Sequence, residues 1–128
     1  IVDAPFVPGA VDFIINYHND YDLFISTGTP QNEIIEIINR TNMRKYFKSI
    51  HGSPDPKNIH IKKIIQNNHY KHNELIFIGD ADADISAAKA YSLPIIFREH
   101  KDVRYQMEYK NMTKVNDLKG LKGIIDSF

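Results

Sequence analysis

The residues of this 128-residue chain best suited to chemistry are three aspartates at alternate positions, Asp80, Asp82 and Asp84. They follow an apolar run at residues 75–78 and a single glycine. A short apolar run that ends in Gly-Asp predicts a buried parallel strand that delivers a carboxylate to the carboxyl edge of a sheet. The alanine-rich stretch at residues 84–90 predicts a helix directly after it.

We expect Asp80 at the tip of the strand and Asp84 in the first turn of the helix, folded back towards Asp80. Two carboxylates that converge beside the positive end of a helix form a hard oxygen site suited to Mg²⁺. The carboxyl edge of an open α/β sheet is also where ligands bind. The simpler alternative is that these residues cap the helix, because Asp is a preferred N-cap. One Asp would satisfy a cap, so three within five residues favour the metal site.

Two other segments have the chemistry to bind a phosphate. Residues 26–29, Ser-Thr-Gly-Thr, end an apolar run with hydroxyls and lead into backbone N–H groups at the start of a helix, which suits a phosphate. Lys57 begins another predicted helix, and a cation there can neutralise a phosphoryl group during transfer. Taken singly, Thr27 is as well explained by a capping role and Lys57 by an exposed surface position.

The composition predicts one ordinary globular domain over residues 1–128. Hydrophobic residues make up 42% and charged residues 25%, and the formal net charge is zero, so nothing favours a nucleic-acid or membrane partner. The chain has no cysteine, which excludes disulfides and thiolate metal sites. We therefore expect a cytoplasmic protein.

Predicted strands and helices alternate along the chain. Strands are expected at residues 23–27, 75–78, 93–97 and 112–115, with residues 46–50 forming a short strand or a connector. Helices are expected at residues 8–17, 84–91 and 117–125, around residues 34–38 and from residue 58 onwards. This alternation indicates βαβ units, and so an α/β fold with a mainly parallel sheet flanked by helices.

In this order, Thr27, Lys57 and the Asp80/Asp84 pair resemble the second, third and fourth motifs of the haloacid dehalogenase superfamily of phosphatases. The resemblance spans roughly residues 5–100. Within the superfamily, the sequence is similar to phosphoglycolate-phosphatase-like members. Residues 27–31, Thr-Gly-Thr-Pro-Gln, look closer to the family's Ser-Gly-Thr-Pro-Gln variant than a motif starting at Ser26. Receiver domains combine similar residues, but their acids come first.

The resemblance implies a Rossmann-like core and a Mg²⁺-dependent hydrolase of small phosphomonoesters that acts through an aspartyl-phosphate. In that family the Thr27 position hydrogen-bonds a phosphoryl oxygen, with the Gly28 amide assisting. The Lys57 position neutralises the phosphoryl group and the nucleophile. The Asp80 and Asp84 positions anchor Mg²⁺, directly or through water. The expected partner is accordingly a small phosphorylated metabolite.

The position of Asp82 is left free in the family's motif, so we expect its side chain to face solvent or to lie behind the metal ligands.

The family's first motif, an Asp-x-Asp after a hydrophobic strand, has no counterpart. The only early acid, Asp3, follows just two apolar residues and precedes Ala4-Pro5, so we reject it as the nucleophile. In the resembling family that strand lies at the centre of the sheet, and without it two interior strand edges would lack partners. We therefore expect a longer protein, with the nucleophile and cap upstream of Ile1, and association through the incomplete sheet.

Two alternatives follow from the missing motif and from the fold. A regulatory module on the same fold would bind phosphate or Mg²⁺ without hydrolysis. A dehalogenase shares the fold but needs no metal, and the Asp80/Asp84 pair disfavours it. Fold alone does not separate these functions.

Overall fold

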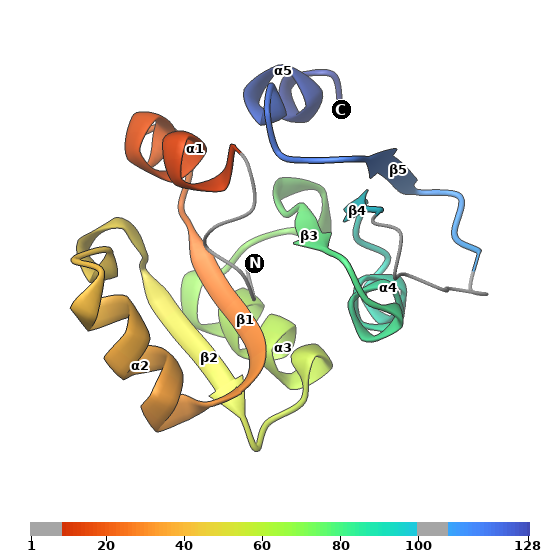
Figure 1. Cartoon of the computed structure of the whole chain (residues 1–128). Helices are drawn as coiled ribbons and strands as arrows, with labels where there is room; N and C mark the ends of the chain where they lie inside the picture. Colours follow the sequence, from red (N-terminus) through yellow and green to blue (C-terminus); the bar gives the residue numbers. More distant parts are fainter. Residues whose placement is uncertain (1–8, 100–107) are drawn as a thin grey trace. The chain divides into compact units, whose positions relative to one another are not determined.

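The computed structural model describes residues 9–99 and 108–128, drawn in Figure 1. The chain divides into two compact units, one formed by residues 1–56 with 117–128 and the other by residues 57–116. Hydrogen bonding joins the described strands into two sheets, β1-β2 in the first unit and β3-β4-β5 in the second. Every strand pair in both sheets is parallel. The predicted α/β fold with parallel strands flanked by helices is therefore confirmed.

The first unit is built on one βαβ repeat. Its elements are α1 (Ala10–Tyr17), β1 (Phe24–Pro30), α2 (Gln31–Arg40), the 3₁₀ helix η1 (Arg44–Tyr46), β2 (Ser49–Ser53) and α5 (Leu121–Asp126). Ile25 lies opposite Ile50 in the ladder, and α2 covers the strands with Ile34 and Ile38, four residues apart on one face. The core is completed by other buried apolar residues, Ile14, Met43 and Phe47.

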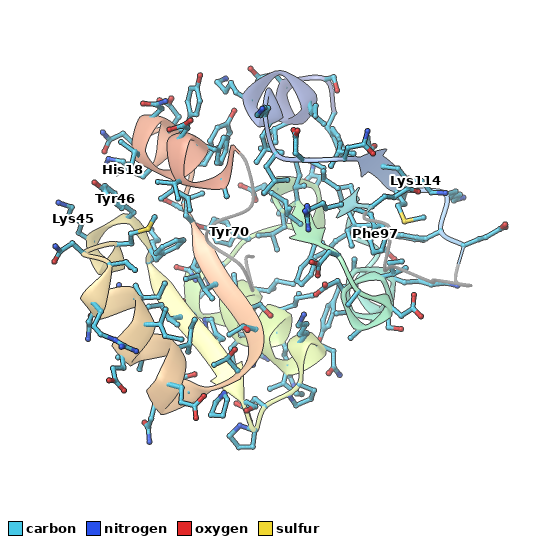
Figure 2. The ribbon with its side chains drawn as sticks, in the orientation of Figure 1. His18, Lys45, Tyr46, Tyr70, Phe97 and Lys114 are labelled. Atoms are coloured by element: carbon cyan, nitrogen blue, oxygen red, sulfur yellow. The ribbon has the colours of Figure 1, made fainter. Side chains whose placement is uncertain are left out.

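Aromatic contacts join α1 to η1 within this unit. The ring of His18, which follows α1, lies 4.7 Å from that of Tyr46, and Lys45 Nζ lies 5.3 Å from the centre of the Tyr46 ring. Figure 2 labels the three side chains. These contacts hold the end of α1 next to η1.

The second unit contains α3 (Lys57–Asn68), the 3₁₀ helix η2 (His72–Glu74), β3 (Phe77–Gly79), α4 (Asp82–Ala90), β4 (Ile95–Arg98) and β5 (Met112–Val115). The central strand β4 has three consecutive fully buried residues, Ile95, Ile96 and Phe97. A continuous apolar run is expected where a parallel strand is covered on both faces. Gly79, the last residue of β3, lies opposite Phe97.

Only the strand predicted at residues 112–115 keeps its bounds. The strands predicted at residues 75–78 and 93–97 are β3 and β4, which begin two residues later and end one residue later, and the differences are larger in β1 and β2. The strand expected to stop at Gly28 continues to Pro30, because Pro30 keeps an extended backbone with ψ of 142° and pairs with Ser53. The short strand or connector expected at residues 46–50 is a strand, but β2 begins at Ser49 and extends to Ser53. Gly52 is required there because a Cβ would overlap the backbone oxygen of Thr29, and a strand glycine often marks such a close approach.

The helix boundaries also shift. The helix predicted from Asp84 begins at Asp82. The final helix begins at Leu121 rather than residue 117, because Gly120 has a left-handed backbone, φ 69°, which interrupts helical geometry. The acid rejected as nucleophile, Asp3, lies outside the described residues.

Within residues 9–99 and 108–128, no helix combines the length and the apolar character that crossing a membrane requires.

Candidate functional site

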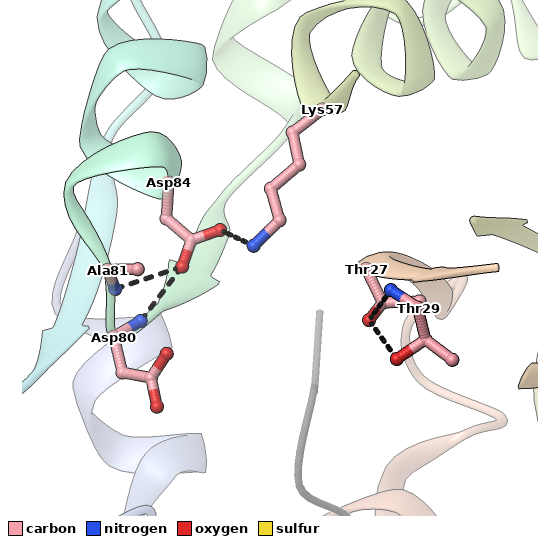
Figure 3. A network of polar contacts seen from close by, with 6 residues as sticks. All are labelled: Thr27, Thr29, Lys57, Asp80, Ala81 and Asp84. Carbon is pink, nitrogen blue, oxygen red and sulfur yellow. Dashed lines mark hydrogen bonds and ion pairs between the residues drawn. The ribbon is translucent and has the colours of Figure 1, made fainter. Parts of the chain in front are cut away.

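The Asp84 carboxylate organises the junction between β3 and α4. It is the third residue of α4, and Asp84 is only 2% exposed. Its Oδ2 accepts hydrogen bonds from the backbone N–H groups of Asp80 (3.0 Å) and Ala81 (3.1 Å), as Figure 3 shows. The predicted fold-back of Asp84 towards Asp80 is confirmed. Asp84 therefore also caps α4, so the capping alternative holds for this residue.

Gly79 makes room for that carboxylate. A Cβ on Gly79 would overlap the carboxyl group of Asp84. The Gly-Asp sequence at the end of the strand thus has a steric cause, since a larger residue would displace the buried acid.

Lys57 holds the other oxygen of Asp84. It is the first residue of α3, and its Nζ lies 2.5 Å from Asp84 Oδ1 (Figure 3). The side chains are 12% and 3% exposed respectively. Removing one partner of such a pair leaves an uncompensated buried charge, at a cost of about 3–5 kcal/mol. Two predicted site residues 27 positions apart are therefore joined directly.

Asp80 and Asp82 have different surroundings. Asp80 directly follows β3, its side chain is 31% exposed, and its Oδ2 lies 3.9 Å from Nη1 of Arg98. Asp82, the first residue of α4, is exposed, which agrees with the first of the two positions expected for it, facing solvent or behind the metal ligands. Arg98 was not predicted from the sequence, because nothing in its local pattern separates it from other basic residues.

The donor chemistry around Asp80 fits Mg²⁺. The described residues contain no group of three or more His, Asp or Glu side chains that could hold a metal. Mg²⁺, however, is commonly bound by one or two carboxylates, with water and substrate oxygens completing its shell. Asp84 already accepts three contacts from Lys57 and the two amides, so Asp80 is the better placed carboxylate for direct ligation. The metal-ligand roles of Asp80 and Asp84 stay predictions.

In the first unit, the Thr27 hydroxyl bonds within β1, to the residue two positions further along the strand. Thr27 is 1% exposed, its Oγ1 accepts a hydrogen bond from Thr29 N (3.2 Å), and it donates to Thr29 Oγ1 at 3.3 Å (Figure 3). Gly28 between them is exposed, with open space at its Cβ position. Gly28 is thus the first exposed residue after the buried part of β1. The phosphate-binding roles of Thr27 and Gly28 stay predictions.

Gln31, the first residue of α2, is hydrogen-bonded to β2. Its Nε2 donates to the carbonyl of Ile50 (2.9 Å), and its Oε1 accepts from the N–H of Gly52 (2.5 Å). One side-chain amide thus replaces two backbone partners at the point where the ladder between β1 and β2 becomes irregular. Gln31 is the last residue of the Thr-Gly-Thr-Pro-Gln segment that resembles the family's motif. The sequence did not predict that its side chain bonds to β2.

Residues 4–97 match the model of a family described as haloacid dehalogenase-like hydrolase. No curated protein matches the chain.

Solved structures share the fold at low sequence identity. The core domain of a protein proposed to be a phosphoglycolate phosphatase, from Streptococcus pneumoniae, is 17% identical with a TM-score of 0.78, over 99% of this chain and 92% of that one. A predicted phosphatase from Clostridium acetobutylicum is 20% identical with a TM-score of 0.80, over 94% and 60%. YfnB from Bacillus subtilis, proposed to be a hydrolase of the same kind and bound to magnesium, is 19% identical with a TM-score of 0.79, over 94% and 56%. This chain therefore spans little more than half the length of the last two proteins.

Proposed function

The chain belongs to the haloacid dehalogenase-like hydrolase family, and on that premise we propose that it forms the core of a Mg²⁺-dependent hydrolase of small phosphomonoesters. The observation that carries the proposal is the cluster at the end of β3. Asp84 is held by Lys57 and by the two amides around Asp80. This arrangement places an acid and a cation at the edge of the sheet where α/β folds bind ligands.

In the proposed reaction, each residue of the chain has a limited task. Asp80 and Asp84 would hold Mg²⁺, which would supply positive charge opposite the phosphoryl oxygens when bound. Lys57 adds a further positive charge next to Asp84. Thr27 and the amide of Gly28 donate hydrogen bonds to a phosphoryl oxygen. The hydrogen bond that the Thr27 hydroxyl donates to Thr29 Oγ1 is long, at 3.3 Å, and therefore weak. Redirecting this donor to a ligand costs little free energy.

The proposed chemistry is a double displacement at phosphorus. An aspartate carboxylate attacks, the P–O bond to the ester breaks, and the alcohol leaves with a proton; water then hydrolyses the aspartyl-phosphate to phosphate and the free carboxylate. We propose that this aspartate lies outside residues 1–128, because the early acid Asp3 is not followed by a second acid in an Asp-x-Asp pattern.

The test is Mg²⁺-dependent release of phosphate from p-nitrophenyl phosphate, measured on this chain and on the product of its full reading frame. The Asp80→Asn variant of the active protein should lose at least about 100-fold in rate, because metal binding is worth several kcal/mol. It should also bind Mg²⁺ more weakly by calorimetry. Asp82→Asn is the matched control and should keep the activity. Full activity in Asp80→Asn would remove Asp80 from the metal site.

The same assay addresses the alternative of a silent binding module, which the missing first motif favours. If the full product binds Mg²⁺ and phosphate but releases no phosphate from any ester, the binding module replaces the hydrolase. If only the longer protein turns over, the nucleophile lies outside this chain.

A further inference from the structure

Arg98 lies next to Asp80 at the edge of the sheet. Arg98 is the last residue of β4, and Gly79 of β3 lies opposite Phe97, so Asp80 and Arg98 are the next residues along two paired strands. Their side chains approach to 3.9 Å between Nη1 and Oδ2. A guanidinium is therefore present beside the carboxylate that we propose as a metal ligand, although none of the motifs discussed above includes it.

The hydrogen-bond donors of Arg98 are incompletely used. Within the described residues its Nε is buried and has no hydrogen-bond partner. The distance to Asp80 exceeds the 3.2 Å or so that an N–H···O bond spans. A guanidinium carries five donors that suit the paired oxygens of a carboxylate or phosphate. A buried donor without an acceptor costs free energy, and an incoming anion that draws the side chain towards it can remove that cost.

A simple counter-ion role explains this geometry less well. The Lys57–Asp84 pair is a close ion pair in the same unit, with the charged atoms 2.5 Å apart and both side chains almost buried. Arg98 is 26% exposed and Asp80 31% exposed, and their contact is 3.9 Å. Strong Arg–carboxylate pairs are shorter and often bidentate. Arg98 is thus placed near Asp80 without being closely bound to it.

Arg98 also balances the net charge of the side chains around Asp80. Lys57, Asp80 and Asp84 together contain two carboxylates and one ammonium, so without Arg98 the group is negative and would repel an anionic ligand. Arg98 brings the charge of these four side chains to neutral before any metal binds. An anion then meets a guanidinium that is partly exposed to solvent.

We propose that Arg98 is an anion-binding residue that contacts an oxyanion of the substrate beside Asp80. The inference rests on the proposed hydrolase function, because it names a further substrate contact of the same site. The oxyanion is either the phosphoryl group or a carboxylate elsewhere in the substrate. Both have the planar or near-planar pairs of oxygens that a guanidinium recognises.

The test is calorimetric titration of the chain, in the presence of Mg²⁺, with methylphosphonate and with phosphonoacetate. Neither compound has a phosphate ester bond to hydrolyse, and only phosphonoacetate carries a carboxylate. Arg98→Gln should weaken binding by about 10- to 100-fold, the range for a hydrogen bond to a charged group. Arg98→Lys keeps the charge but loses the paired donors, so its affinity should lie between that of the unchanged chain and that of Arg98→Gln.

The matched control is Arg40→Gln. Arg40 also lies 3.9 Å from an acid, Glu36, but both side chains are about two-thirds exposed on α2. This variant should bind both compounds as the unchanged chain does. Circular dichroism and urea unfolding of each variant check that the fold is kept.

The outcomes separate cleanly. Weaker binding of both compounds by Arg98→Gln assigns Arg98 to the phosphoryl group, and weaker binding of phosphonoacetate alone assigns it to a carboxylate. Unchanged affinity for both compounds overturns the inference, as does failure of the unchanged chain to bind either. Tighter Mg²⁺ binding with unchanged anion affinity would show that Arg98 only balances Asp80. If the product of the full reading frame releases no phosphate while Arg98-dependent binding persists, the hydrolase proposal falls and the anion site stands.

Discussion

Two lysine–aspartate pairs in this protein have the same separation and very different surroundings. Lys57 and Asp84, in the second unit, are 2.5 Å apart and nearly buried. Lys122 and Asp126, on α5 in the first unit, are also 2.5 Å apart, with side chains 36% and 52% exposed. Distance alone therefore says little about the energetic weight of an ion pair, because water screens the exposed one and competes for both partners.

The surroundings of the aspartates extend the contrast. Asp84 accepts two backbone N–H groups at the start of α4 in addition to the lysine, so its removal would leave donors unsatisfied and a cation buried. Asp126 accepts from Lys122 and from the hydroxyl of Tyr21 (2.8 Å) at the surface, where water can replace both. The buried pair organises a site, whereas the exposed pair ties the end of a helix to a neighbouring aromatic.

The largest expected effect is on the buried pair. Asp84→Ala should lower the free energy of unfolding by about 3–5 kcal/mol, because Lys57 would remain nearly buried after losing the carboxylate 2.5 Å from its Nζ. Urea unfolding followed by circular dichroism measures the change. The double variant Lys57→Met, Asp84→Ala should recover part of the loss, and Asp82→Ala, at an exposed position of the same helix, should change stability by less than about 0.5 kcal/mol. A loss in Asp84→Ala no greater than in Asp82→Ala would contradict the comparison.

A substitution at Gly79 disturbs the same aspartate by crowding. Gly79→Ala should cost about 1–3 kcal/mol, the usual range for overpacking, because the new Cβ overlaps the Asp84 carboxyl group. Gly123→Ala is the control, since Gly123 has open space at its Cβ position within α5 and alanine favours a helix. That control should be neutral or stabilising. Equal unfolding midpoints for the two variants would show that Asp84 moves aside freely.

The uncharged side-chain amide of Gln31, which bonds to β2 twice, is expected to have an intermediate effect on stability. Gln31→Leu removes the donor to Ile50 and the acceptor for Gly52, and should cost about 1 kcal/mol, because the half-buried position lets water replace part of the lost bonding. Gln31→Glu keeps an acceptor for Gly52 and should lose less. A loss in Gln31→Leu as large as in Asp84→Ala would mean that charge is not what separates the two regions.

The smallest effect belongs to the exposed pair and depends on pH. Hydrogen bonds from Lys122 and Tyr21 lower the pKa of Asp126 below its ordinary value of 3.8, so the folded state favours the carboxylate. This contribution is complete above the unfolded pKa and is lost as pH falls through the lower folded pKa. Asp126→Asn should therefore melt slightly below the unchanged chain at neutral pH, with the difference vanishing in stronger acid. A difference that grows below pH 3.8 would contradict the sign.

The parts of the site that were predictable lie close together in sequence. The apolar run before Gly79 and the fold-back of Asp84 follow from strand and helix geometry over a few residues, whereas the expectation for Asp82 came from the resemblance to the family's motif. The edge strand at residues 112–115 also matches β5. The end of β2 was missed, because glycine and serine usually signal a turn, and only the approach of Thr29 shows why a glycine is needed within the strand.

The sequence by itself determined the alternation of strands and helices and the position of the aspartates at the end of a buried strand, because both depend on local periodicity. The order of the motifs is likewise visible in the chain without any structure. Tertiary structure alone decided that Lys57 pairs with Asp84, that Arg98 lies beside Asp80, and that Gln31 bonds to β2. Each of these contacts joins residues at least 18 positions apart, and their geometry depends on strand register and helix packing. The two lysine–aspartate pairs are likewise told apart only by burial, which depends on the folded chain around them.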